Sequence, residues 1–212
     1  MIRNWLMAAL CCGLAACAAT DEDLSLPPEP LGQFRLGHNI AIADNVTLGP
    51  FSRELSETKL EAALQSAVAK RLRRYDGDGL YHLGIVVGGL VLAQPGVPVI
   101  YAPQSVMIVD VTVFDNTTQE KLNEKPKRIT AGEGLQNAVP VLGSGYVRSA
   151  DEQLENLSEG VARGIEAWLK NNPDWFTPRE GQVRVPYDVL TDAPSIDASS
   201  TEDISAAAEP AN

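Results

Sequence analysis

The chain has few of the residues that metal, disulfide and nucleic-acid chemistry require. Its 212 residues include 2 histidines and 3 cysteines, too few for a disulfide framework or a typical zinc cage. Basic residues are also scarce, because 17 Lys and Arg stand against 28 Asp and Glu, for a formal net charge of −11. A general nucleic-acid binder needs a basic surface for phosphates, so we expect no nucleic-acid partner.

The chain also lacks an apolar run long enough to span a membrane. Its longest run covers residues 5–16 and begins two positions after Arg3. As a helix rising 1.5 Å per residue, this run would reach about 18 Å, against about 30 Å of bilayer hydrocarbon. A short apolar run behind a basic start is typical of a signal peptide. We therefore expect residues 1–16 to be a signal peptide. We expect no segment of the remaining chain to span a membrane.

The residues Leu14–Cys17 at the end of this run resemble the bacterial lipobox. Small residues admit the chain to a narrow peptidase groove, and the cysteine thiol accepts the lipid. Neither Cys11 nor Cys12 follows such a sequence. The resemblance implies cleavage before Cys17 and its modification with fatty acids such as palmitate, enough for stable membrane anchoring. By likeness to enteric lipoproteins, Ala18 favours the periplasmic face of the outer membrane, with the inner membrane as the alternative.

Acidic residues gather at both ends of the remaining chain. Residues 21–30 hold 4 acids and no base, and residues 172–212 hold 8 acids and 2 bases. Acidic, proline-containing flanks of this kind are usually solvated and disordered. We therefore predict a lipidated cysteine and acidic tether over 17–32, a globular domain over 33–176, and a disordered acidic tail over 177–212.

Three segments of the predicted domain have strand patterns. Residues 33–43 alternate in polarity, and residues 80–93 and 105–115 are longer β-rich runs. The proline-containing segment between the last two predicts that they form a hairpin. Residues 120–129 are polar and include Pro126, which suits an edge strand.

Two segments have helical spacing. Residues 56–75 carry an apolar stripe and contain a capping-box sequence at Thr58–Glu61. Residues 149–170 begin with a second capping box at Ser149–Glu152 and carry the stripe Leu154, Leu157, Val161, Ile165 and Leu169. Trp175 and Phe176 are expected to dock back on the domain.

The element order β-α-β-β-β-α predicts an α+β fold. We expect a two-layer sandwich, in which a mostly antiparallel sheet of three or four strands carries both helices on one face.

The sequence contains no recognisable catalytic or metal-binding set. His38 and His82 lie in predicted neighbouring strands, but two imidazoles without an acidic ligand make a poor zinc site. Asp110 is expected on the solvent face of its strand, and Ser144 lacks the glycine spacing of a nucleophile elbow. Nucleophiles and general bases act through partners at defined positions. We therefore predict no catalytic residue, no cofactor and no metal, and a protein that is not an enzyme.

Two groups of residues are candidate partner contacts. Arg71 and Arg74 lie in the basic end of the first predicted helix, where they contact a partner or an anionic lipid, or merely offset the helix dipole. Val139, Val141 and Leu142 form an apolar stretch in a glycine-containing loop. This stretch either docks a partner or packs on the sheet.

The chain as a whole resembles small Gram-negative periplasmic lipoproteins. The likeness covers residues 33–170, including the hairpin sequence VDVTVFDNTTQEKL at 109–122, and is one of topology. The better-understood members act in transport, in activation of peptidoglycan synthases and in envelope assembly. The resemblance therefore implies a lipid-anchored protein that binds an envelope partner. The alternative is a small-ligand or lipid-binding module, with its pocket between the glycine-rich second strand and residues 130–147.

Overall fold

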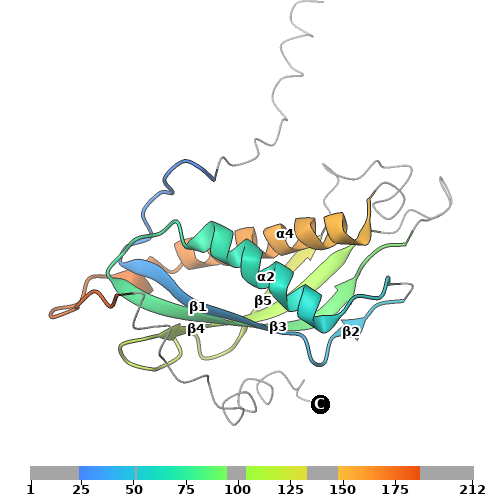
Figure 1. The fold of residues 1–212 in the computed structure, drawn as a ribbon. Helices are drawn as coiled ribbons and strands as arrows, with labels where there is room; N and C mark the ends of the chain where they lie inside the picture. The colour runs from blue at the N-terminus through green and yellow to red at the C-terminus, as the bar shows by residue number, and fades with distance from the viewer. Residues whose placement is uncertain (1–23, 51, 95–103, 133–147, 187–212) are drawn as a thin grey trace, which may run out of the picture.

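The computed structural model describes residues 24–50, 52–94, 104–132 and 148–186, which form one sheet with two helices on one of its faces (Figure 1). The elements in chain order are β1 (Phe34–Ile42), β2 (Thr47–Leu48), α2 (Glu57–Leu72), β3 (Gly79–Val91), β4 (Val106–Asp115), β5 (Lys127–Gly132), α4 (Ala150–Lys170) and the 3-10 helix η2 (Pro173–Phe176). The α+β class and the placement of both helices on one face agree with the sequence-based prediction.

The sheet is mixed, so the prediction of a mostly antiparallel sheet is wrong. Its strand order is β1-β3-β4-β5, and β2 pairs with β3 beyond the end of β1. The predicted hairpin is confirmed, because β3 and β4 are antiparallel, as are β4 and β5. However, β1 and β2 both run parallel to β3. The reason is α2, which carries the chain back across the sheet from β1 and so returns β3 in the same direction.

The two predicted capping boxes have different outcomes. At α4 the box forms, because Glu152 N–H donates to Ser149 Oγ at 3.2 Å and Ser149 N–H donates to Glu152 Oε2 at 2.7 Å. The bonds that Ser149 N–H and the Ser149 hydroxyl donate to Glu152 Oε2 lower the pKa of the Glu152 carboxyl. At α2 the box at Thr58–Glu61 does not form, since the helix already begins at Glu57. Glu61 instead accepts a hydrogen bond from Ala43 N–H at 3.0 Å, which ties α2 to the end of β1.

The edge strand begins later than the sequence predicts. It spans Lys127–Gly132, whereas residues 120–126 form a turn with one isolated bridge between Phe114 and Lys121. The Asn123 side chain accepts from Val113 N–H at 2.9 Å and donates to the Val111 carbonyl at 3.1 Å. A side chain thus satisfies the backbone groups of β4 that a longer strand would pair.

The hydrophobic core lies between the sheet and the helices. The predicted α4 stripe is buried throughout, and α2 buries Leu60, Leu64, Val68 and Leu72 against the same layer. From β3 and β4 come alternate residues that are 0–1% exposed: Leu83, Ile85, Val87, Met107, Val109, Val111 and Val113. No helix among the described residues is long and apolar enough to cross a membrane.

An aromatic cluster closes one end of this core. Phe176 is fully buried, with its ring centroid 5.1 Å from that of Phe34 and 5.0 Å from that of Tyr81. Trp175 meets Trp168 of α4 edge to face at 5.4 Å, so the predicted docking of Trp175 and Phe176 is confirmed. Gly32 lies against the Phe176 carbonyl with φ at +50°, where a side chain would be both strained and in collision.

Candidate functional site

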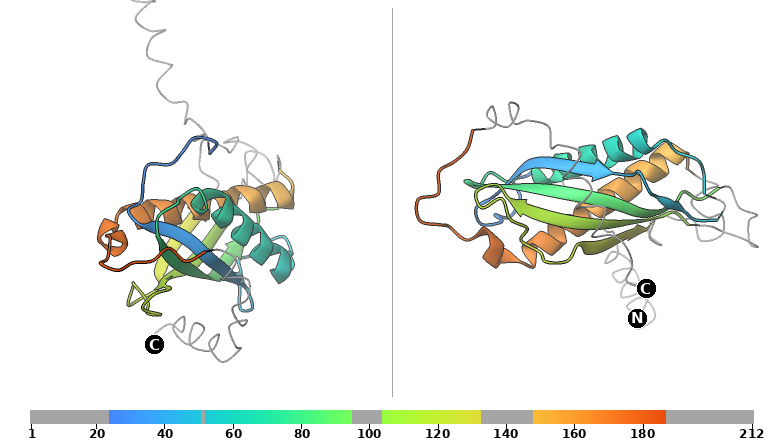
Figure 2. Two further views of the ribbon diagram at one scale, coloured as in Figure 1. Left: turned by 60° about the vertical axis from the view of Figure 1, so that its left-hand side comes forward. Right: turned by 90° about the horizontal axis from the view of Figure 1, so that it is seen from below.

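The side of the sheet away from α2 and α4 is the candidate site, and we call it the helix-free face (Figure 2). Because side chains alternate along a strand, the residues between the core positions point to this side. They include a set of half-buried apolar side chains that are not part of the core cluster: Ile40, Ile42, Val86, Val106 and Ile108. The helix-free face is therefore largely apolar at its centre.

Glycine makes the centre of this face shallow. The register places Gly84 between Ile40 of β1 and Thr112 of β4, so one cross-strand row has no side chain in its middle. At Gly88, an added Cβ would come no closer than 4.0 Å to any neighbour. A flat apolar surface with missing side chains can accept apolar side chains from another segment.

The two histidines meet at one end of the helix-free face. Their ring centroids are 5.2 Å apart, and the rings are stacked. His38 N–H donates to His82 Nδ1 at 2.9 Å, so Nε2 carries the proton and donates to Asn116 Oδ1 at 3.0 Å. Burial is the main cause that lowers the pKa of the His82 imidazole. Only glycine fits at Gly37, because an added Cβ would lie 2.6 Å from the His82 ring.

The sequence correctly anticipated that the two histidines could face one site, since their rings stack. Both ring nitrogens of His82 are used within the domain. Among the described residues, no group of three or more His, Cys, Asp or Glu side chains could hold a metal ion. Asp110 projects from the helix-free face as expected and is held by two bonds to Arg128, at 3.0 and 2.9 Å. Ser144 lies outside the described residues.

The candidate partner contact Arg71 lies inside the domain, which corrects its placement on the surface. It is 5% exposed, and its guanidinium lies 2.6 Å from a Glu166 carboxylate oxygen. Tyr75 donates to the other Glu166 oxygen at 2.6 Å, and Lys170 lies 3.7 Å from that oxygen. A buried ion pair of this kind joins α2 to α4 and leaves the Arg71 charge inaccessible to a partner.

Arg74 is half-buried at the end of α2. It donates to the Leu26 carbonyl at 2.8 Å and lines a hollow of about 340 Å³ together with Pro27, Pro28 and Pro30. Arg74 therefore holds the segment that leads into the domain. The remaining candidate contacts, Val139, Val141 and Leu142, lie outside the described residues.

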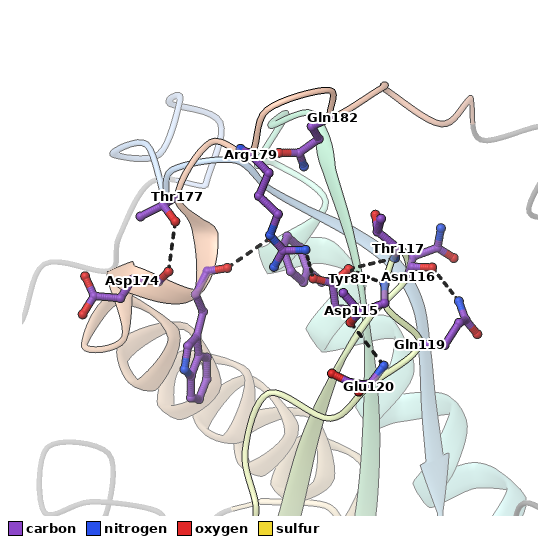
Figure 3. A network of polar contacts seen from close by, with 12 residues as sticks. Tyr81, Asp115, Asn116, Thr117, Gln119, Glu120, Asp174, Thr177, Arg179 and Gln182 are labelled. Atoms are coloured by element: carbon purple, nitrogen blue, oxygen red, sulfur yellow. Dashed lines mark hydrogen bonds and ion pairs between the residues drawn. The ribbon is translucent and has the colours of Figure 1, made fainter.

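A polar cluster that the sequence reasoning missed closes the end of β3 and β4 (Figure 3). Asp115 is 2% exposed, forms an ion pair with Arg179, and accepts from Thr117 N–H at 2.8 Å. Tyr81 donates to the Trp175 carbonyl at 3.2 Å, and burial raises the pKa of its phenol. The hydrogen bond to Asp115 raises the pKa of Arg179. The available signal was that the acidic residues 172–212 contain only two bases, Arg179 and Arg184.

These two arginines hold the described part of the predicted tail against the domain. After Arg179, Arg184 pairs with Asp76 and lies 3.4 Å from Asp78. The Val185 carbonyl then accepts a hydrogen bond from the Arg35 guanidinium. Residues 177–186 therefore lead from η2, across the strand ends, to β1.

Two hollows among the described residues are lined by residues other than the β3 glycines. The hollow beside Arg74 is one of them, and another of about 370 Å³ lies between α2 and α4, where Lys59 and Lys70 face Asp151 and Glu159. The pocket proposed for the ligand-binding alternative was to combine β3 with residues 130–147. Most of that loop lies outside the described residues.

Comparison with known proteins gives fold-level matches at low similarity. No family model matches the chain, and no curated protein is significantly similar. A candidate lipoprotein from Caulobacter crescentus is 15% identical over 61% of this chain and 90% of its own, with a TM-score of 0.34. A Xanthomonas campestris protein from a domain family of unknown function is 11% identical over 71% of this chain and 93% of its own, with a TM-score of 0.40.

A minor lipoprotein from Acinetobacter baumannii is 15% identical over 62% of this chain and 93% of its own, with a TM-score of 0.26. Such identities and TM-scores assign no family. The function is therefore argued from this chain's own residues.

Proposed function

We propose that this protein is a lipid-anchored component of the Gram-negative cell envelope that binds a protein partner and performs no catalysis. The observation that carries the proposal is the lipobox-like sequence Leu14–Cys17 at the end of a short apolar run. Cleavage before Cys17 would leave a mature chain whose single cysteine carries the lipid. The chain would then be held at the periplasmic face of the outer membrane.

The distance from the anchor to the domain supports a partner in or near the membrane. The core begins at Leu31, which is 5% exposed, and lies 14 positions after Cys17 in the sequence. At no more than about 3.5 Å per residue, this tether reaches about 50 Å at full extension. The domain would therefore stay close to the membrane surface, within reach of other envelope proteins.

The anchor is tested by replacing its cysteine in the full-length chain. Cys17→Ala should abolish labelling by radioactive palmitate and leave an uncleaved precursor or a released protein. Cys12→Ala is the matched control, because that cysteine would be removed with the signal peptide, and it should leave labelling unchanged. Membrane fractionation and the intact mass of the purified chain give the two readouts. A Cys17→Ala chain that is still labelled and processed would refute the lipoprotein assignment.

The non-enzymatic part of the proposal is tested by complementation. Cells that lack the gene and show a phenotype would receive His38→Ala, His82→Ala, Asp110→Asn or Ser144→Ala, each checked for folding and abundance. We expect every folded variant to restore function, because no sequence motif places a nucleophile–base pair at any of these four residues. A folded variant at normal abundance that fails would favour a catalytic or ligand-binding site.

A further inference from the structure

Helices α2 and α4 lie side by side on the sheet (Figure 1) and leave a hollow of about 370 Å³ between them. We call this hollow the inter-helix groove. The side of α2 that lines it carries small residues, including Ala63, Ser66 and Ala67. Small-molecule pockets measure about 300–1,000 Å³, so the groove has room for a side chain of another protein.

The acidic row of α4 along this groove is only partly matched by bases of α2. Asp151, Glu155 and Glu159 line the groove at intervals of four residues, or about 6 Å along a helix. Lys59 pairs with Asp151 at 2.6 Å, and Lys70 pairs with Glu159 at 2.9 Å. Within the described part of the chain, Glu155 makes no ion pair or hydrogen bond, although its charge helps to raise the pKa of Lys70. The groove therefore holds one carboxylate more than it holds ammonium groups.

A buried hydroxyl in the same groove lacks a hydrogen-bond partner. Ser158 is 1% exposed and lines the groove together with Leu154, which is 3% exposed. Among the described residues, Ser158 Oγ makes no hydrogen bond, not even to the carbonyl four positions earlier that a serine within a helix can reach. Buried polar groups are ordinarily hydrogen-bonded, so this hydroxyl favours a partner that comes from outside the domain.

An arginine side chain suits this combination better than a lysine does. Ser158 follows Glu155 by three positions, so the hydroxyl and the carboxylate are neighbours on the surface of α4. A guanidinium has five N–H donors in a planar fork and can donate to both groups at once, whereas an ammonium is a compact, strongly hydrated charge. The apolar stem of an arginine would pack on Ala63, Ala67 and Leu154.

We propose that the inter-helix groove binds an arginine side chain of the protein partner, with its guanidinium donating to Glu155 and to the Ser158 hydroxyl. The inference rests on the proposed partner-binding function and names the chemistry of one contact. The added positive charge balances the acidic row of α4, and it gives Ser158 Oγ the donor that it lacks. Arginine is also one of the residues that most often carry the binding energy of protein interfaces.

The small cation n-butylguanidinium, an analogue of the arginine side chain, tests the groove without the partner. Added to the full-length, processed chain at constant ionic strength, it should shift the amide NMR signals of Ala63, Ser66 and Ser158 to saturation. The neutral analogue n-butylurea should not. Glu155→Gln should weaken binding roughly fivefold, and Ser158→Ala should weaken it about threefold.

Glu124→Gln is the matched control, because it removes the charge of an exposed carboxylate in the turn before β5 and should leave binding unchanged. Circular dichroism would confirm that each variant is folded. If n-butylguanidinium binds Glu155→Gln as tightly as it binds the unmodified chain, or shifts only signals outside the groove, the proposal is overturned.

Complementation then tests whether the partner uses the groove. Glu155→Arg places a guanidinium of the chain's own at this position, so the folded variant should fail to restore function at normal abundance, whereas Glu124→Arg should restore it. Restoration by Glu155→Arg would refute the proposal. Palmitate labelling measures the anchor separately. A chain that is labelled at Cys17 but does not bind n-butylguanidinium refutes the groove alone, and one that binds the probe but carries no label refutes the anchor alone.

Discussion

Glu166 joins the two helices through a buried ion pair with Arg71. It accepts hydrogen bonds from both Arg71 and Tyr75 while it is only 4% exposed. A buried ion pair is weak evidence for added stability, because desolvation offsets much of the attraction. Removing one partner, however, leaves an uncompensated buried charge.

We expect Glu166→Ala to lower the free energy of unfolding by about 3–5 kcal/mol, because the Arg71 guanidinium then remains buried without its partner. Lys59→Ala is the matched control, since it breaks an exposed helix-to-helix pair with Asp151 and should cost at most about 1 kcal/mol. Urea denaturation followed by circular dichroism measures both. A loss of the same size in the two variants would contradict the structural role of Glu166.

His82 should make the stability of the domain depend on pH. Its neighbours are His38, Asn116 and Asp115, and burial lowers the pKa of its imidazole below 6.5. In the folded state, protonation would also place a proton on Nδ1, which accepts from His38 N–H. The unfolded chain therefore binds the proton more readily than the folded chain, and stability falls as the pH drops below about 6.5.

The expected result is a lower melting temperature at pH 5 than at pH 7.5, with a smaller difference in His82→Gln than in the unmodified protein. Carboxyl groups elsewhere titrate equally in both proteins, so the comparison between them isolates the imidazole. Melting curves at the two pH values provide the measurement. An identical pH dependence in the variant would show that His82 does not contribute.

At the scale of elements, the features predicted for α4 agree well with the structure. Its capping box and its apolar stripe are both found where the sequence places them. Both features depend on residues three or four positions apart, so they are settled within the helix itself. The register of β3 with β4, in contrast, depends on contacts between strands.

Leu157→Asp and Ile165→Asp should each unfold the domain, because an unpaired carboxylate in the core costs several kcal/mol, comparable with the whole stability of a domain. Ala167→Asp introduces the same side chain on the exposed side of α4 and should change stability by less than about 1 kcal/mol. Thermal melting distinguishes the two outcomes. Wild-type melting in both core variants would mean that the stripe does not face the core.

At the scale of the whole molecule, the first ten residues after Phe176 lie against the domain. Residues 177–186 contact the domain through Arg179, Arg184 and Val185, although the sequence predicts a tail from residue 177. The acidic composition of that segment favours a solvated tail, and the two bases Arg179 and Arg184 were the signal that it makes contacts. In the structure, Arg179 pairs with Asp115 and Arg184 pairs with Asp76, both near the strand ends.

Truncation after Thr177 should therefore destabilise the domain more than truncation after Pro186. Truncation after Thr177 removes Arg179 and leaves the buried Asp115 carboxylate without this partner. The loss of a hydrogen bond to a charged group costs about 1–3 kcal/mol. Arg179→Ala in the complete chain should reproduce most of the difference. Melting temperatures of the three forms measure it, and equal values would show that the Asp115 ion pair adds no stability.

The sequence by itself determined the features that depend on neighbouring residues. These are the signal-like run with Cys17 at its end, the two helices, the long hairpin and the α+β class. Each rests on periodicity or on a short motif, and both are local properties of the chain.

Only the tertiary structure decided the rest. The direction of β1 follows from the path of α2 across the sheet, and the burial of Arg71 follows from the position of Glu166, 95 residues later. The pairing of Asp115 with Arg179 likewise joins two residues that are far apart in the sequence. Such contacts depend on how the layers meet, and charge or polarity at one position does not reveal the partner that folding brings to it.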